Sequence, residues 1–151
     1  MENNQTENLP ISNPIDSNIR TDWMAEVTFL LKDLWYPSES DEPIEWISFQ
    51  TSIAPPLTTT DLVHCQGFVP ELVVEEKEVE NFWEPVITLE DWFGEDEKLQ
   101  VGKFLELKQL MEDNLKDIQL FRVGQVEIEL YLIGQFNTCE WVGLKTKVIE
   151  T

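Results

Sequence analysis

The final third of the chain alternates apolar and polar residues in three successive segments, and this pattern limits most strongly what the chain can fold into. The segments are residues 118–123, 126–132 and 141–150. Alternation with a period of two is typical of strands that bury one face. Gly124-Gln125, between the first two segments, favours a tight type II′ hairpin turn. We therefore expect the chain to end in neighbouring antiparallel strands.

Two longer segments carry the spacing of helices instead. Residues 95–116 place apolar side chains on one stripe and charged side chains on the other face, as an amphipathic helix requires. An earlier helix is expected to begin near Asp22, a favourable N-cap residue, and to end before Pro37. The apolar positions that define the two stripes are Trp23, Val27, Leu30, Leu31 and Leu34 in the first and Val101, Phe104, Leu107, Met111 and Leu115 in the second.

Shorter elements fill the region between these helices. The pattern predicts strands at 44–51 and 71–75, short helices at 60–65 and around 79–83, and a connecting loop at 85–93. Helices combined with terminal hairpins indicate an α/β fold, a mixed sheet with antiparallel C-terminal strands covered by helices. Residues 1–21 are rich in Asn, Ser and Pro and lack an apolar period. We interpret 1–21 as a disordered N-terminal tail and 22–151 as a single domain.

The charge balance restricts the possible partners. Thirty Asp and Glu against ten Lys and Arg give a net charge of −20 over 151 residues. Such a surface repels nucleic acid, whose binding needs cations, and anionic membranes, while it attracts a basic protein. A solubilising role for the charge is the alternative. The sequence has no apolar run long enough for a membrane span and no signal peptide, so we expect a cytoplasmic protein.

The residues that could support catalysis are few. The sole histidine, His64, stands beside Cys65 in a predicted helix, where adjacent side chains diverge by about 100° and cannot form a nucleophile pair. Phosphate-binding, hydrolase and EF-hand motifs are absent from the sequence. Cys65 and Cys139 lack metal-binding spacing, and whether they pair stays open. We therefore expect no enzyme and no cofactor of its own, although carboxylate catalysis such as glycoside hydrolysis remains a lesser alternative.

Two places favour recognition of a partner. The acidic loop 38–43 presents carboxylates, Glu39 among them, between a helix and a strand; a solvated turn is the alternative. Trp92 lies between Glu90-Asp91 and the acidic run 95–97. An exposed Trp among carboxylates suits an interface hot spot that meets arginine, whereas a Trp that only packs its loop onto the core is the alternative.

Four segments in sequence order resemble the bacterial nuclease A inhibitor family. They are the stretch Leu34-Trp35-Tyr36-Pro37-Ser38-Glu39-Ser40-Asp41-Glu42-Pro43, then Glu90-Asp91-Trp92 with the acidic residues after it, then Val123-Gly124-Gln125-Val126-Glu127, and the ending Thr146-Lys147-Val148-Ile149-Glu150-Thr151. The resemblance covers residues 22–151. It implies a three-layer α/β/α sandwich with helices on both faces of the sheet, which agrees with the α/β fold expected from the elements.

The resemblance also implies a function: inhibition of a metal-dependent, sugar-non-specific DNA/RNA nuclease by blocking its active site. Thr151 would then ligate the nuclease's Mg²⁺, in the complex only, through its hydroxyl and terminal carboxylate. Glu39 matches a carboxylate that pairs with a nuclease arginine, and Trp92 matches an aromatic interface contact. The implied inhibitor is a monomer that forms a one-to-one complex.

The sequence departs from the family pattern in three places. The N-terminal tail is additional, the stretch 55–70 is shorter than usual, and Pro37 stands within the first motif. These departures leave open a second hypothesis, an acidic binding module for another basic partner. That alternative shares the charge-driven association but has no metal dependence.

Overall fold

The computed structural model describes residues 12–67 and 72–149, with only the backbone described for residues 12–21. Its helices and strands follow each other in the order α1 (Ser12–Leu31), β1 (Trp35–Tyr36), β2 (Glu42–Pro43), β3 (Glu45–Gln50), α2 (Thr59–Gln66), β4 (Val74–Lys77), α3 (Glu80–Ile87), α4 (Glu95–Asn114), β5 (Lys116–Val123), β6 (Glu127–Gln135) and β7 (Glu140–Ile149). The α/β class expected from the sequence is confirmed.

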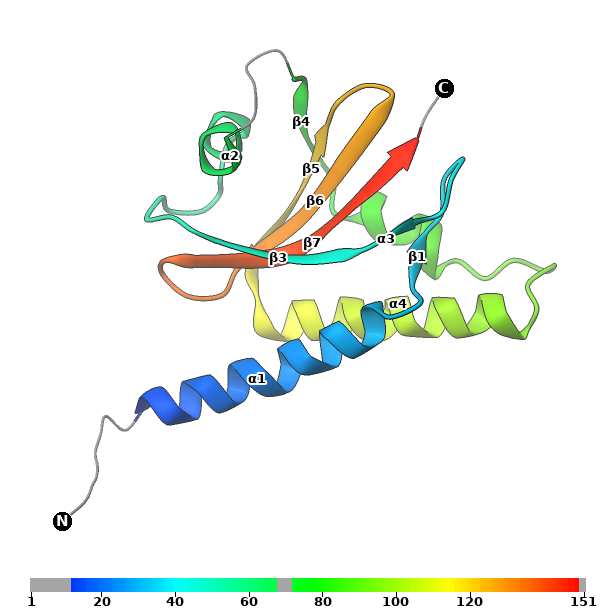
Figure 1. Ribbon diagram of the computed structural model, residues 1–151, viewed down its shortest axis with the longest axis horizontal. Helices are drawn as coiled ribbons and strands as arrows, with labels where there is room; N and C mark the ends of the chain where they lie inside the picture. Colours follow the sequence, from blue (N-terminus) through cyan, green and yellow to red (C-terminus); the bar gives the residue numbers. More distant parts are fainter. Residues whose placement is uncertain (1–11, 68–71, 150–151) are drawn as a thin grey trace.

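Five strands form the main sheet in the order β3-β7-β6-β5-β4, and every pairing is antiparallel. The expectation of a mixed sheet is therefore wrong. The last three strands form a meander, as their alternation predicted. β3 and β4 follow each other in the chain's strand order but occupy opposite edges of the sheet. The segment between them must therefore cross a face of the sheet, and it carries α2 across (Figure 1).

One face of the sheet, called the first face here, packs against α1, α3 and α4 (Figure 1). Its core includes Val27 from α1, Phe82 from α3 and Leu107 from α4, which are all fully buried. Strand alternation supplies the other side of this core, because every second residue of a strand points to the same face. The sheet residues of this core are Leu120, Ile128, Leu130, Leu132, Val142, Leu144 and Val148.

The other face, called the second face, has a smaller cover. Leu62 of α2 and Leu57 of the preceding loop pack there against Phe121, Ile133 and Trp141. A capping box begins α2, since Thr58 Oγ1 accepts from the Asp61 amide at 3.1 Å and Asp61 Oδ2 accepts from the Thr58 amide at 2.9 Å. Helices thus lie on both faces, but a complete third layer is not confirmed.

The remainder of the second face carries charged side chains from β6 and β7. Glu129 and Lys145 approach to 3.6 Å, and so do Glu127 and Lys147. The Tyr131 hydroxyl donates to Glu129 at 3.1 Å, and burial together with the nearby carboxylate raises the pKa of Tyr131. This half of the second face is therefore exposed to solvent rather than covered by a helix.

Several local expectations differ from the structure. α1 begins at Ser12 rather than near Asp22, because a helix can continue through residues without an apolar stripe once its packed part is formed. The prediction of a disordered tail for residues 1–11 lies outside the described residues. The strand expected at 71–75 is β4, Val74–Lys77. Pro85, expected in a loop, lies inside α3.

The tight turn expected at Gly124-Gln125 is also wrong. Val123 pairs with Glu129, so residues 124–128 connect the paired positions and form a longer loop than a two-residue turn. Gly124 has a φ of +105°, which glycine adopts without strain. Its amide donates to the Val73 carbonyl at 2.9 Å, so this loop also holds the chain that enters β4.

Candidate functional site

The acidic loop 38–43 is the end of a small hairpin, which the sequence pattern did not reveal. Its strands β1 and β2 pair Trp35 with Pro43 and Tyr36 with Glu42. Two-residue strands are too short to show alternation, which explains why the segment was expected to be a loop. The burial of β1 nevertheless alternates, because Trp35 is exposed and Tyr36 is buried.

Three neighbouring elements fix this hairpin in place. The Tyr36 hydroxyl donates to the Phe82 carbonyl of α3 at 2.7 Å, and burial raises the pKa of Tyr36 far above its ordinary value. Gln100 of α4 accepts from the Trp35 amide at 3.4 Å. On the β7 side, Thr146 Oγ1 donates to the Pro43 carbonyl at 2.9 Å. The hairpin is therefore positioned before any partner arrives.

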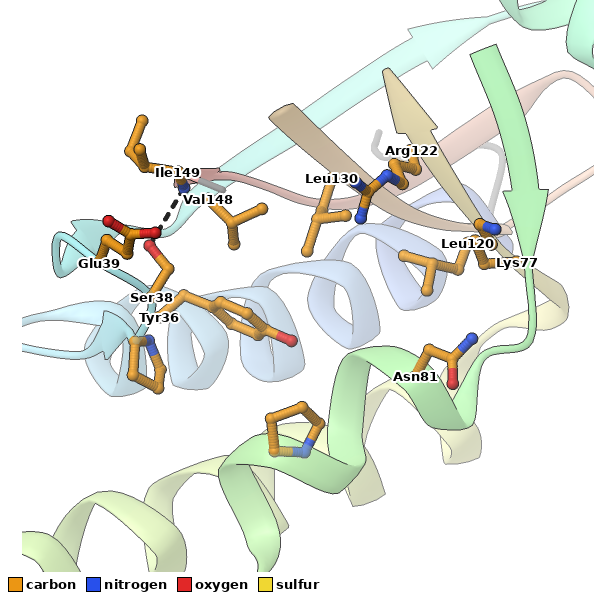
Figure 2. A pocket seen from close by; sticks show the side chains of 12 residues that line it. Tyr36, Ser38, Glu39, Lys77, Asn81, Leu120, Arg122, Leu130, Val148 and Ile149 are labelled. Atoms are coloured by element: carbon orange, nitrogen blue, oxygen red, sulfur yellow. Dashed lines mark hydrogen bonds between the residues drawn. The ribbon is translucent and has the colours of Figure 1, made fainter. Parts of the chain in front are cut away.

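The tip of the hairpin meets the last described residue of β7. The Ile149 amide donates to Ser38 Oγ at 3.2 Å, and the Ser38 hydroxyl donates to the Ser40 carbonyl at 2.7 Å. Figure 2 shows Glu39 beside this contact, at the same end as Ile149. Glu39 is exposed and has an interaction within the chain. Thr151, the third predicted contact residue, lies outside the described residues, two positions after Ile149.

Trp92 lies on the loop that connects α3 to α4. It is 73 % exposed, and its ring meets Phe93 edge-on with a centroid distance of 4.6 Å. The loop is ordered by the Phe93 amide, which donates to the Glu90 carbonyl at 3.1 Å, and by the Gly94 amide, which donates to Glu97 Oε1 at 2.9 Å. The alternative in which Trp92 only packs its loop onto the core is therefore wrong.

The structure brings the hairpin and the Trp92 loop to one groove of about 360 Å³. Trp35 and Asp41 of the hairpin segment line it together with Trp92 and Glu97. On the other side of the hairpin, Glu39 lines a larger cavity of about 760 Å³, and Pro37 and Pro85 border both hollows. Glu39 and Trp92 therefore belong to the same end of the molecule, with the hairpin between the two hollows.

The other residues considered from sequence stand apart from this end. His64 is exposed on α2. Cys65 is half-buried, Cys139 is exposed, and both are unpaired thiols. Within residues 12–67 and 72–149, no group of three or more His, Cys, Asp or Glu side chains is placed to hold a metal ion. Of the helices that the structure describes, none is long and apolar enough to span a membrane.

Sequence reasoning missed several residues that line the larger cavity. Tyr36, Lys77, Asn81 and Arg122 come from four different elements, so no local spacing connects them. Arg122 did carry a signal. It follows Leu120 by two positions, and Leu120 faces the core, so a charged residue at that position of an apolar strand indicates a polar hollow next to the core.

The fold places the chain in the α/β class with a five-stranded antiparallel sheet. A family model described as NuiA, nuclease A inhibitor-like protein, matches residues 21–151. The chain therefore belongs to the nuclease A inhibitor-like family, as the resemblance indicated, and membership suggests an inhibitor of a nuclease rather than an enzyme. No curated protein matches the chain at the similarity required for a relative.

Proposed function

We propose that this protein inhibits a metal-dependent, sugar-non-specific DNA/RNA nuclease by occupying its active site, with Glu39, Trp92 and Thr151 as the contact residues. The observation that carries the proposal is the contact between Ser38 Oγ and the Ile149 amide at 3.2 Å. It holds the Glu39-bearing tip against the end of β7, and Trp92 stands exposed on the neighbouring groove. Family membership supports the nuclease as the partner.

The net charge of −20 explains how such an inhibitor reaches its target. A nuclease that grips polyanions is basic around its active site, so an acidic protein is steered towards it. The chain offers carboxylates where the substrate offers phosphates. The nuclease can bind them, but it finds no phosphodiester bond to cleave. The anchored hairpin supports tight binding because little ordering remains to be done on association.

Each of the three residues has a distinct role in this proposal. Glu39 forms a charge-assisted pair with an arginine of the nuclease. Thr151 supplies its hydroxyl and its terminal carboxylate, hard oxygen ligands, to the nuclease's Mg²⁺. Trp92 packs against a basic side chain at the interface. The inhibitor acts as a monomer in a one-to-one complex in the cytoplasm, without a cofactor of its own and without direct contact to nucleic acid.

The test is a titration of the protein into a purified Mg²⁺-dependent non-specific nuclease while DNA cleavage is followed. We expect stoichiometric inhibition, a loss of orders of magnitude when Thr151 is deleted, and a cost of about 2–5 kcal/mol in binding for Glu39→Ala. Glu106→Ala is the matched control, because Glu106 is an exposed acid of α4 that lines neither hollow.

Two outcomes would contradict the proposal at different levels. Full inhibition by the protein without Thr151 removes the metal-bridging mechanism but keeps the inhibitor. If the nuclease is not inhibited and affinity capture retains a different basic protein, the chain is an acidic module for another partner.

Added salt should slow association more than it speeds dissociation, because steering acts on the encounter.

A further inference from the structure

The larger cavity lies between the tip of the hairpin, α3 and the first face of the sheet. Its volume of about 760 Å³ is in the range of small-molecule pockets. Leu120, Leu130 and Val148 of the sheet form an apolar side, and all three also belong to the first-face core. The ring of Tyr36 borders the hollow from the hairpin (Figure 2), and Pro85 of α3 also lines it. Leu130 and Val148 keep 8 % and 6 % of their surface exposed, so an apolar ligand body has a narrow apolar strip to lie on.

The polar side chains of this cavity are separated by charge. Arg122 of β5, Lys77 of β4 and Asn81 of α3 gather at one end, and Glu39 lies at the other, next to Ile149 (Figure 2). Arg122 pairs across the sheet with Leu130, a residue of the first-face core. Paired residues lie on the same face, so the guanidinium leaves the strand on the side of the cavity. The hollow thus has two cations and an amide at one end and a carboxylate at the other. Glu75, which pairs with Arg122 across β4 and β5, offsets part of the positive charge.

The end with the two cations is unusual for a chain with thirty acidic and only ten basic residues. Arg122 is half-buried, so its guanidinium loses part of its hydration, and an anion that accepts its hydrogen bonds offsets part of that cost. Arg122 already has an interaction within the chain, but a guanidinium has five N–H donors and can serve a ligand in addition. The Lys77 ammonium lies 3.7 Å from Glu75 in a pair that is open to solvent, and such pairs hold weakly.

We propose that this cavity binds a small organic anion with an apolar body, in the class of aryl or alkyl carboxylates, sulfonates and phosphates. The anionic group lies against Arg122, Lys77 and the Asn81 amide, and the body lies over Leu120, Leu130 and Val148. Glu39 fixes the orientation, because an anionic group at its end of the cavity would be repelled. The proposal concerns the isolated protein and does not depend on a nuclease.

The test compares two fluorescent probes that differ in one group. 8-Anilinonaphthalene-1-sulfonate carries the anion, and N-phenyl-1-naphthylamine has the same aromatic body without it. In titrations of the full chain we expect saturable one-to-one binding of the sulfonate. Arg122→Gln should weaken it about 10-fold or more, since hydrogen bonds to charged groups contribute at that level, and should change binding of the neutral probe less than about twofold.

Two further variants locate the site and control for charge. Lys147→Gln removes the same charge from the second face, where Lys147 pairs with Glu127, and should leave both probes unaffected. Asn81→Trp narrows the cavity from the exposed surface of α3 and should abolish binding of both probes. Circular dichroism and thermal unfolding establish that each variant is folded, so Asn81→Trp still tests the site if Arg122→Gln does not fold.

Several results would overturn the proposal. Equal affinity for the sulfonate and the neutral probe would show that the cavity is only apolar. Undiminished sulfonate binding by Arg122→Gln would remove the anion contact, and undiminished binding by Asn81→Trp would place the probes elsewhere on the protein. If neither probe binds saturably, the cavity does not bind a ligand of this class. None of these results bears on nuclease inhibition, which is measured separately.

Discussion

The two faces of the sheet are covered to very different extents. On the first face, three helices and seven sheet residues form one continuous core. On the second face, one eight-residue helix and the loop before it cover Phe121, Ile133 and Trp141, while ion pairs stand on the strands beside them. Apolar burial is the main stabilising contribution, so the first face should hold most of the stability.

The comparison also explains where the candidate site lies. The hairpin is bonded to α3 through Tyr36 and to α4 through Gln100, and both helices belong to the strongly packed first face. A recognition surface is most precise when it is supported by rigid elements. The site at the hairpin therefore draws its rigidity from the larger core, and changes on the second face should leave it largely intact.

The largest expected effect contrasts one buried leucine from each face. Leu107 of α4 and Leu62 of α2 are both fully buried. Leu107→Ala should lower the free energy of unfolding by about 4 kcal/mol, and Leu62→Ala by about 2 kcal/mol, because a short helix on an open face can move to fill the cavity. Urea unfolding followed by Trp fluorescence measures both values. Equal costs would contradict the unequal contribution of the two faces.

The next effect appears at alkaline pH and involves a tyrosine on each face. Burial raises the pKa of both Tyr36 and Tyr131, and Glu129 adds to the effect at Tyr131. The unfolded chain ionises near pH 10, so stability that is complete below that pH should fall progressively above it. The chain has two tyrosines, so tyrosinate absorbance should stay low in the folded protein above pH 10 and rise on unfolding.

Replacing Tyr36 separates the contributions of the two tyrosines to the pH dependence. Tyr36→Phe removes the bond to the Phe82 carbonyl, and tyrosinate absorbance then reports Tyr131 alone. Ordinary titration of either phenol in the folded protein, near pH 10, would show that its surroundings are more hydrated than its burial indicates.

A smaller effect is expected at the capping box of α2. Thr58→Ala removes the hydroxyl that accepts from the Asp61 amide and should cost about 1 kcal/mol. Because α2 belongs to the weaker face, the change should appear first as faster amide hydrogen exchange in α2, with α4 unchanged. Faster exchange in both helices to the same degree would mean that the two faces unfold as one unit.

The smallest effect is expected among the charges of the second face. Lys147→Gln removes a 3.6 Å pair with Glu127, in which both side chains are exposed. Exposed pairs contribute little, so the free energy of unfolding, measured by thermal unfolding, should change by less than about 0.5 kcal/mol. A larger loss would show that the ion pairs of β6 and β7 replace, in energy, the missing helical cover.

The sequence predicted the elements in which an apolar pattern repeats several times, and it missed those defined by contacts between distant segments. The stripe from Val101 to Met111 and the alternation of β6 repeat often enough to be recognised, and both elements form as expected. β1 and β2 have two residues each and no period to detect. β3 and β4 lie at opposite edges of the sheet, and each pairs antiparallel with a strand of the C-terminal meander. These pairings join segments that are distant in the sequence, so local pattern does not reveal them.

The candidate site was predictable in its exposed residues and not in its cavity. Trp92 and Glu39 stood among charges and matched family motifs, and both are exposed on one end of the molecule. Lys77, Asn81 and Arg122 come together only because β4 lies beside β5 and α3 packs over them. Such convergence of separate elements follows from tertiary structure and leaves only a weak trace, an arginine in an apolar strand.

The crossing between β3 and β4 has a consequence for how this chain tolerates changes in length. The two strands are separated by four strand spacings, roughly 19 Å, while residues 51–73 provide far more chain than that distance requires, at about 3.3 Å per extended residue. Insertions or deletions in this connection can therefore be absorbed without shifting either edge of the sheet. They would remodel the cover of the second face and leave the hairpin, on the opposite side, where it is.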